Sequence, residues 1–423
     1  MTWTPGDALR FGQRRTLLLC WFAYTLAYTL RVNIAVVIPA LVSVRGYSYA
    51  QIGLITGAFF VSYMFGQLIH GYLGDIVSSK LLIVGGLSLS ALCNLGMVIA
   101  ATFGQALLIW GLNGIVQSML WAPIMKTLAQ WYNRQQLERV SFIMALSMIA
   151  GYALSWGVSS LLMDHADWSR VFSLPAAVAA VHALVMLVLF RSRPDRAPAV
   201  DAPRPSRATG RRQEDRMPIG AYFGLVRLPG LLLIAVCHGL IREGIGVWFP
   251  GMLRDLGRTP PGYAWLVLVV VQLANLAGIL LVRRVSLAYR GESARTLLAV
   301  FGVVGASVGA VPLLMRFWAP ASVVLLAVPL ALTHGLTPVM TSLIPFQYAR
   351  YGRVSLTAGV LDFAIYLGAA VSGISSGLII DRLGWNGVTL VWAAAAAAGL
   401  ALAFNRRAAM RGESYADEIG VSR

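Results

Sequence analysis

The stretch YTLRVNIAVVIP, residues 28–39, places one arginine in the middle of an otherwise apolar segment. Arg31 lies about ten residues or more from either end of that segment, too far for its side chain to reach the headgroups of a membrane. An arginine at that depth costs about 3 kcal/mol or more and needs a partner or water inside the protein. The stretch therefore predicts a membrane-spanning helix with a polar site around Arg31.

The composition extends this prediction to the whole chain. Of its 423 residues, 58% are hydrophobic and 12% are charged, whereas about a quarter of the residues in a water-soluble domain are charged. Long apolar segments recur along the sequence, and each is long enough to cross a bilayer of about 30 Å. We therefore predict an all-α integral membrane protein that crosses the membrane many times.

The apolar segments predict twelve membrane-spanning helices in two groups of six. They are expected at 16–44, 50–72, 79–101, 104–131, 138–163, 169–190, 229–254, 261–283, 294–315, 318–345, 354–379 and 384–405. With the N-terminus inside, most of the 34 basic residues fall in cytoplasmic segments, which is the positive-inside bias. Both termini are therefore predicted in the cytoplasm. The net charge of +17 then reflects membrane topology, and no nucleic-acid partner is expected.

A polar stretch rich in proline and arginine separates the two groups of helices. We predict a first six-helix bundle at 1–190, a cytoplasmic linker at 191–228, a second bundle at 229–410 and a cytoplasmic tail at 411–423. The linker composition is typical of a flexible segment, and its basic residues also fit contact with anionic lipid headgroups.

The two halves resemble each other weakly around their first helices. Arg31 is followed eight residues later by Pro39, and Arg242 is followed eight residues later by Pro250. Such an echo favours a duplicated six-helix unit, an architecture that places transporter binding sites near the midplane where the repeats meet. A structural ion pair for each arginine is the alternative.

Polar side chains recur on one face of several predicted helices. Tyr24, Tyr28 and Arg31 have the spacing i, i+4 and i+7, which is one helix face. Similar spacing joins Tyr63, Gln67 and His70 on the second helix and Asp362 and Tyr366 on the eleventh, while the tenth carries His334. These stripes indicate a shared wet cavity. Two guanidinium groups facing it would suit an oxyanion such as phosphate, and carboxylates would also fit.

The loop GYLGDIVSSK, residues 71–80, resembles a signature of the major facilitator superfamily. Gly71, Asp75 and Lys80 match that signature, while Ile76 and Ser78 depart from it. In physical terms, Gly71 is expected to permit close helix packing. Asp75 is expected near a helix N-terminus, where it would pair with positive charge and latch one conformation. Lys126, on the fourth helix, is expected to be a structural or gating charge.

Four longer segments resemble a narrower group, the organophosphate:phosphate antiporters. These segments are AYTLAYTLRVNIAVVIPAL (23–41), LNGIVQSMLWAPIMKTLAQWY (112–132), LIREGIGVWFP (240–250) and AIYLGAAVSGISSGLIIDRLGW (364–385). The resemblance implies that Arg31 and Arg242 bind the substrate phosphate. It also implies substrate-binding roles for Tyr24, Tyr28, Tyr63 and Tyr366, to which the polar stripes add Gln67 and His334.

The sequence also departs from that group at the proposed site. Gln67 stands where a lysine is common, and Met148 lies near the position of a histidine found in some members. Glu243 and Asp362 are additional acids, and both are candidates for proton coupling. These changes favour a less charged substrate or a proton-coupled cycle.

Together these features predict a secondary transporter that exchanges a small organic phosphate for inorganic phosphate by alternating access. A proton-coupled carrier of organic anions or drugs is one alternative, and a transporter-like sensor or receptor is another. We expect no catalytic residues, no cofactor and no metal, because no nucleotide-binding loop, nucleophile–base set or metal-ligand spacing is present. The resemblance further implies a monomer surrounded by lipid, and the arginine-rich, lysine-poor composition favours a bacterial inner membrane.

Overall fold

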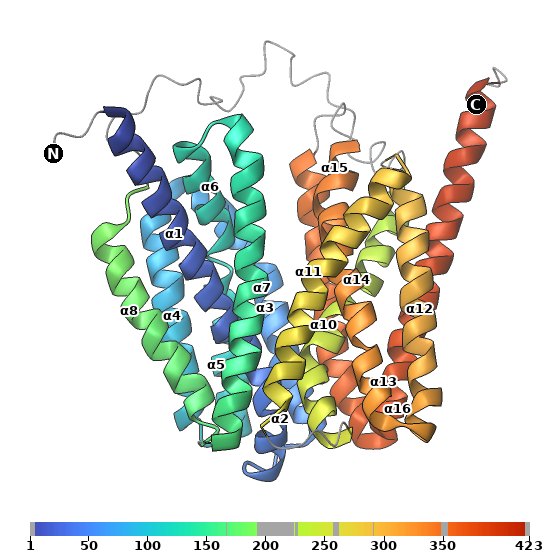
Figure 1. The fold of residues 1–423 in the computed structure, drawn as a ribbon, viewed down its shortest axis with the longest axis horizontal. Helices are drawn as coiled ribbons and strands as arrows, with labels where there is room; N and C mark the ends of the chain where they lie inside the picture. The colour runs from blue at the N-terminus through green and yellow to red at the C-terminus, as the bar shows by residue number, and fades with distance from the viewer. Residues whose placement is uncertain are drawn as a thin grey trace. The chain divides into compact units, whose positions relative to one another are not determined.

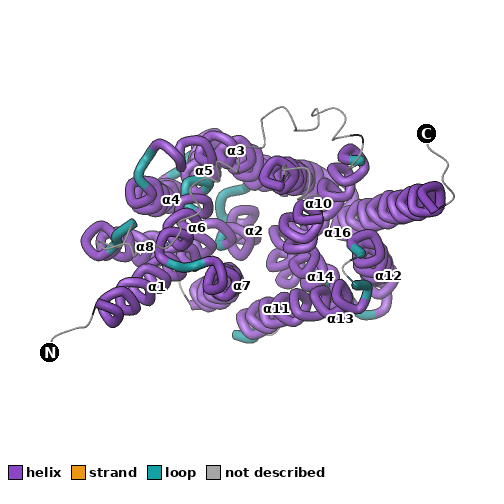
Figure 2. Tube along the Cα trace, turned by 90° about the horizontal axis from the view of Figure 1, so that it is seen from above, coloured by secondary structure: helices purple, strands orange, loops and turns teal. Residues whose placement is uncertain are grey.

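The computed structural model describes residues 5–165, 167–192, 224, 227–256, 262–290, 292–347 and 354–418. Within these ranges the chain forms helices and no strands (Figures 1 and 2). The helices before the predicted linker are α1 (Pro5–Val32), α2 (Ile34–Ser43), α3 (Tyr49–Ile76), α4 (Ser79–Ile99), α5 (Phe103–Gln117), α6 (Trp121–Trp131), α7 (Arg134–His165) and α8 (Arg170–Leu189). The later helices are α10 (Leu228–Leu256), α11 (Ala264–Ala288), α12 (Ser293–Phe317), α13 (Ala319–Leu325), α14 (Ala327–Pro338), the π-helical turn Val339–Leu343, α15 (Ile344–Gln347) and α16 (Val354–Glu418).

The prediction of an all-α membrane protein is confirmed. In the described part of the chain, 11 helical stretches are long and apolar enough to cross a bilayer. Many of their large apolar side chains face outward, including Ile99 with 81% and Phe317 with 86% of its surface exposed. Such exposure would be unfavourable in water and is expected in lipid.

The sequence predicts twelve spans, whereas the described chain has 11 such stretches. The difference arises in α16. The predicted helices 354–379 and 384–405 both lie within it, and its apolar stretch Leu356–Arg407 has 52 residues. Gly384 interrupts the helical backbone there with φ 66° and ψ −167°, a conformation that glycine adopts without a Cβ penalty. Twelve spans and cytoplasmic termini remain predictions.

The described chain forms two compact units. Unit 1 comprises the described parts of residues 1–45, 58–212 and 261–269, and unit 2 those of 46–57, 213–260 and 270–423. The predicted linker 191–228 lies mostly outside the described residues, and α16 continues as a helix into the predicted tail. The predicted domain boundaries therefore remain predictions.

Unit 1 is built around the first part of α1. Leu19, Ala23 and Leu30 of this helix share a buried apolar cluster with Leu87 of α4 and Ile124 of α6. The cluster also includes buried residues of α7 and α8. Arg31 directly follows Leu30, so this core fixes the helix that carries the arginine.

Unit 2 is organised by close packing of α10 against α16. An added Cβ on Gly239 of α10 would collide with the carbonyl of Ile365, and one on Gly368 of α16 would collide with the carbonyl of Val236. Small residues at such contacts let two membrane helices approach closely. Gly239 lies three residues before Arg242, so this contact also sets the position of that arginine.

We predict that Gly239→Ala destabilises unit 2, because the new methyl group would force α10 away from α16 at a cost of about 1–3 kcal/mol. Thermal unfolding of the detergent-purified protein measures this change. Gly309→Ala is the matched control, since Gly309 lies inside α12 with no atom near the added Cβ. A Gly239 variant as stable as the Gly309 variant would contradict the packing argument.

Candidate functional site

The first membrane helix is interrupted directly after Arg31. α1 ends at Val32 and α2 begins at Ile34. The side-chain oxygen of Asn33 accepts the backbone N–H of Ile34 at 3.0 Å. In a continuous helix that N–H would bond to the carbonyl of Leu30, so this local bond frees the Leu30 carbonyl for other partners.

The Leu30 carbonyl accepts hydrogen bonds from a cluster of buried amide side chains. Asn94 of α4 and Asn113 of α5 donate their side-chain N–H groups to it at 2.9 Å and 3.0 Å. Asn33 in turn donates to the Asn94 side-chain oxygen at 2.8 Å, and Ser90 donates to Asn113 at 2.6 Å. All four side chains are fully buried, and a buried network of this kind specifies one local arrangement. The cluster therefore holds the helix break beside Arg31.

The guanidinium of Arg31 lies among aromatic rings. Its central carbon is 4.8 Å from the ring centre of Tyr63, 5.1 Å from Phe59, 5.4 Å from Tyr28 and 5.7 Å from Phe60. Cation–π contact of this kind stabilises a desolvated cation, and only 6% of Arg31 is exposed. The structure thus brings together three residues predicted from the sequence, Arg31, Tyr28 and Tyr63.

Further aromatic side chains extend this surface. The rings of Tyr24 and Tyr28 are 5.3 Å apart, Tyr24 lies 4.8 Å from Trp121 of α6, and Tyr28 lies 5.3 Å from Tyr152 of α7. Tyr24 and Tyr28 were predicted, whereas Trp121 and Tyr152 were not. Phe59 and Phe60 were also missed, although Phe59 stands one helical turn before Tyr63, which was a usable signal.

The remaining polar residues on α3 have separate environments. Gln67 is half-buried one turn beyond Tyr63, and its predicted contact with substrate remains a prediction. His70 is buried, and its Nδ1 lies 2.7 Å from the hydroxyl oxygen of Ser118. That hydroxyl donates to the Ile115 carbonyl at 2.6 Å, so His70 Nδ1 is the donor in this pair. His70 therefore anchors α3 to the end of α5.

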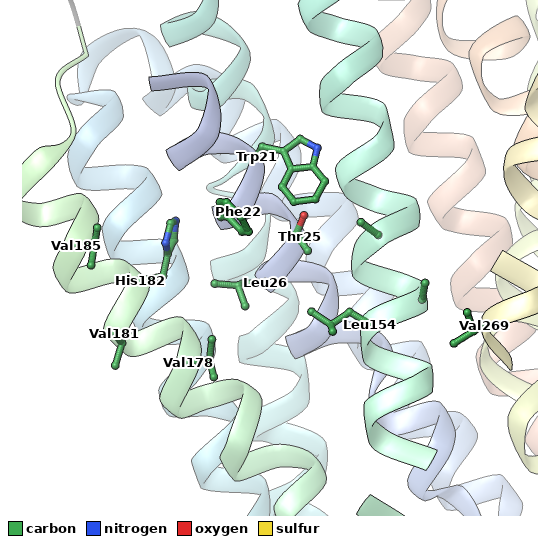
Figure 3. A pocket seen from close by; sticks show the side chains of 12 residues that line it. Trp21, Phe22, Thr25, Leu26, Leu154, Val178, Val181, His182, Val185 and Val269 are labelled. Atoms are coloured by element: carbon green, nitrogen blue, oxygen red, sulfur yellow. The ribbon is translucent and has the colours of Figure 1, made fainter. Parts of the chain in front are cut away.

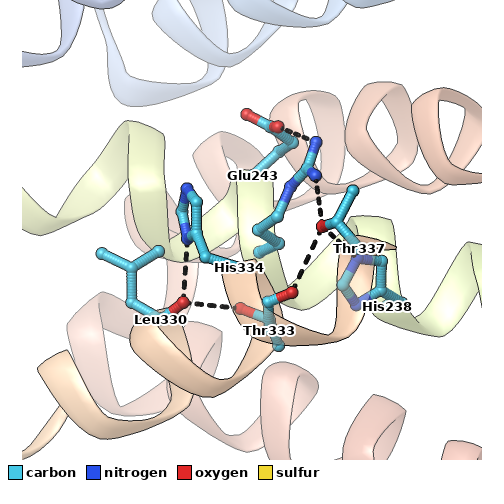
Figure 4. A network of polar contacts seen from close by, with 7 residues as sticks. His238, Glu243, Leu330, Thr333, His334 and Thr337 are labelled. Carbon is cyan, nitrogen blue, oxygen red and sulfur yellow. Dashed lines mark hydrogen bonds and ion pairs between the residues drawn. The ribbon is translucent and has the colours of Figure 1, made fainter. Parts of the chain in front are cut away.

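Arg242 forms the centre of a buried polar network in unit 2. One terminal nitrogen donates to the Thr337 hydroxyl of α14 at 2.8 Å, and the other forms an ion pair with Glu243 (Figure 4). His238, one turn earlier on α10, has its Nε2 3.2 Å from the same hydroxyl. Arg242, Glu243 and His238 are all buried. The sequence reading named the arginine and the glutamate but not His238 or Thr337, whose contacts join residues about a hundred positions apart.

His334 of α14 lies close to this network, and its predicted role in substrate binding remains a prediction. Its Nδ1 is 2.8 Å from the Leu330 carbonyl (Figure 4). A carbonyl only accepts, so His334 Nδ1 is the donor in this bond. The π-helical turn Val339–Leu343 follows one turn later, and such turns are frequent at functional sites.

Asp362 and Tyr366 lie one turn apart on α16. Tyr366 is buried and Asp362 is half-buried, and α16 packs along α10. Both residues are therefore carried by the helix that packs against the arginine-bearing helix, while a role in binding or proton coupling remains a prediction.

The predicted latch is only partly visible. The expected close packing at Gly71 is wrong, because this glycine is exposed and an added Cβ would meet no neighbour. The side chain of Asp75 lies outside the described residues, and Lys80 lies in the first turn of α4. Lys126 of α6 donates to the Gly74 carbonyl and so ties α6 to the end of α3.

A pocket of about 700 Å³ in unit 1 has different chemistry. It is lined by largely apolar side chains of α1, α7 and α8, including Phe22, Leu154 and Val181 (Figure 3). Two of its polar side chains are satisfied by the backbone, since Thr25 donates to the Ser147 carbonyl and Trp21 to the Ile143 carbonyl. Arg31 is not among its lining residues, so this pocket does not suit an anion.

Comparison with known proteins places these features in a family context. The family model for the Major Facilitator Superfamily matches residues 20–355. A probable hexose phosphate transport protein of Chlamydia muridarum is 22% identical over 185 residues, which cover 44% of this chain and 41% of that relative. A glycerol-3-phosphate transporter of Bacillus subtilis is 25% identical over 391 residues, covering 87% of this chain and 86% of the relative.

Solved structures share the fold. A bacterial homologue of the human lysosomal transporter Spinster, in an inward-facing and unoccupied conformation, matches with a TM-score of 0.67. The match covers 93% of each chain at 16% identity. At that identity the likeness concerns the fold alone.

We predict that the amide cluster positions Arg31 as well as stabilising unit 1. Asn113→Ala should lower the unfolding temperature, because a buried polar group that loses its partner costs about 1–3 kcal/mol. It should also raise the inorganic phosphate concentration needed for half-maximal thermal stabilisation by about tenfold, since a misplaced guanidinium loses directed hydrogen bonds. Thermal unfolding across a phosphate titration measures both effects.

Asn275→Ala is the matched control for this experiment. Asn275 is equally buried but donates to Gln272 within α11 of unit 2. It should lower stability without moving the phosphate midpoint. If the Asn113 variant shows the same pattern as the Asn275 variant, the amide cluster has a structural role only.

Proposed function

The chain belongs to the Major Facilitator Superfamily, and we propose that it is a secondary transporter that exchanges a small organic phosphate for inorganic phosphate. The observation that carries this proposal is one buried arginine inside a membrane span of each unit, Arg31 in α1 and Arg242 in α10. Intramembrane arginines are costly and mark substrate pathways.

The named relatives support the substrate class. They are transporters rather than enzymes, and their names specify hexose phosphate and glycerol-3-phosphate. Both substrates are phosphate esters of small polar molecules. The arginine fork fits the shared phosphate group, because guanidinium donates paired hydrogen bonds to two phosphate oxygens.

The surroundings of Arg31 support anion binding. Its charge faces four aromatic rings, and each cation–π contact contributes about 0.5–2 kcal/mol. A bound phosphate would compensate the charge further and would accept hydrogen bonds that ring faces cannot accept.

The same charge balance gives a physical reason for exchange. A carrier that changes conformation without an anion has to move the buried Arg31 charge through an occluded state without the compensation that a bound phosphate adds. A carrier with a phosphate bound avoids that cost. Reorientation should therefore be faster when either the organic phosphate or inorganic phosphate occupies the site. This difference in rate would make the carrier an exchanger. In this proposal two six-helix halves provide alternating access across a bacterial inner membrane.

A second candidate function is a proton-coupled carrier of organic anions. The ion pair between Arg242 and Glu243 favours it, because protonation of an acid beside a substrate arginine would change its affinity for an anion. Asp362 on α16 is the other candidate acid.

Preloaded proteoliposomes separate the two functions. Uptake of labelled phosphate that depends on internal phosphate supports exchange, and uptake driven by a pH gradient alone supports proton coupling.

We predict that Arg31→Lys and Arg242→Lys each reduce phosphate exchange by at least about tenfold, because lysine keeps the charge but loses the planar pair of donors. Exchange of labelled phosphate by proteoliposomes of equal protein content measures the loss. Arg45→Lys is the matched control, since Arg45 also lies over an aromatic ring, that of Trp168, at 4.9 Å. Near-normal exchange by either site variant would contradict the proposed phosphate contact.

A further inference from the structure

Both terminal nitrogens of Arg242 have protein partners in the structure. One donates to the Thr337 hydroxyl and the other pairs with the Glu243 carboxylate (Figure 4). A guanidinium can hold a phosphate in a bidentate geometry through these two terminal nitrogens. A phosphate that binds Arg242 in this way therefore has to replace or share both contacts.

The two partners differ in how strongly they oppose that replacement. Thr337 is neutral, and its hydroxyl remains linked to the Thr333 carbonyl at 3.3 Å and lies near His238. Glu243 is an anion, the same kind of partner as the substrate, and its bond to Arg242 is charge-assisted. Such bonds are about twice as strong as neutral ones. Glu243 is thus the main competitor for this arginine.

Chain connectivity keeps this competitor at the site. Glu243 is the residue directly after Arg242 on α10, and only 4% of it is exposed. A displaced carboxylate cannot leave for bulk water, so it remains close to any anion bound at Arg242. In a poorly solvated environment it would repel that anion.

We infer that Glu243 is a built-in competing anion that weakens phosphate binding at Arg242 and compensates the arginine between substrates. This inference rests on the proposed function. It assigns Glu243 a role in setting the affinity for phosphate and the degree to which phosphate efflux depends on phosphate uptake. A compensated Arg242 also lowers the cost of reorientation without substrate, so the carrier with Glu243 leaks phosphate in the absence of exchange.

The test is Glu243→Gln, which keeps the shape of the side chain and removes its charge. Binding of labelled inorganic phosphate to the purified protein should become about tenfold tighter, because the neutral amide competes less strongly than the carboxylate for the Arg242 guanidinium. In phosphate-loaded proteoliposomes, efflux into phosphate-free medium should fall relative to efflux into medium with phosphate.

Glu292→Gln is the matched control. Glu292 is also a paired acid of unit 2, bonded to Arg295 at 2.6 Å before the first turn of α12. Its variant should bind phosphate as the unmodified protein does. Equal or weaker binding by Glu243→Gln would overturn the inference, since a positioning role for Glu243 predicts weaker binding.

Glu243→Asp provides a second variant that decides the matter if the glutamine variant does not insert. Its shorter carboxylate reaches Arg242 less well, so binding should be tighter than in the unmodified protein, and equal or weaker binding overturns the inference. Failure of the proposed function is distinct, because the unmodified protein itself would then show neither phosphate binding nor exchange.

Discussion

A guanidinium group inside a membrane span has to be compensated by the protein, because the surrounding lipid offers it no hydrogen bonds and little solvation. The two units meet this requirement differently. Arg31 lies among the rings of Tyr28, Phe59, Phe60 and Tyr63, whereas Arg242 is held by Thr337 and Glu243. The contacts described for Arg31 are with aromatic rings, whereas those described for Arg242 include an acidic side chain. The duplicated arginines are therefore chemically unequal.

One helix irregularity directly follows Arg31, and another follows Thr337, which contacts Arg242. The helix break at Asn33 comes shortly after Arg31. The side-chain N–H groups of Asn94 and Asn113 stabilise this break by donating to the Leu30 carbonyl in place of the missing backbone donor. In unit 2 the π-helical turn Val339–Leu343 comes soon after His334 and Thr337. Non-helical backbone at membrane depth is tolerated where protein groups satisfy it, and here those groups surround the candidate binding residues.

The sequence was sufficient for the features that depend on local pattern. Apolar length predicted the helices, and the depth of Arg31 and Arg242 in those segments singled them out. Helical spacing correctly linked Tyr28 with Arg31. Contacts between distant helices could not be obtained this way, which is why Asn94, Asn113, His238 and Thr337 were missed. The expectation of close packing at Gly71 failed because the motif gives no information on which neighbour the glycine faces.

Arg31 and Arg242 are both proposed to contact the phosphate of the substrate. Equilibrium binding of labelled inorganic phosphate to the purified, monodisperse protein tests this proposal most directly. We predict saturable binding that weakens by at least about tenfold when either arginine is replaced by alanine, because each substitution removes charge-assisted hydrogen bonds. Binding that neither substitution changes would contradict the proposal.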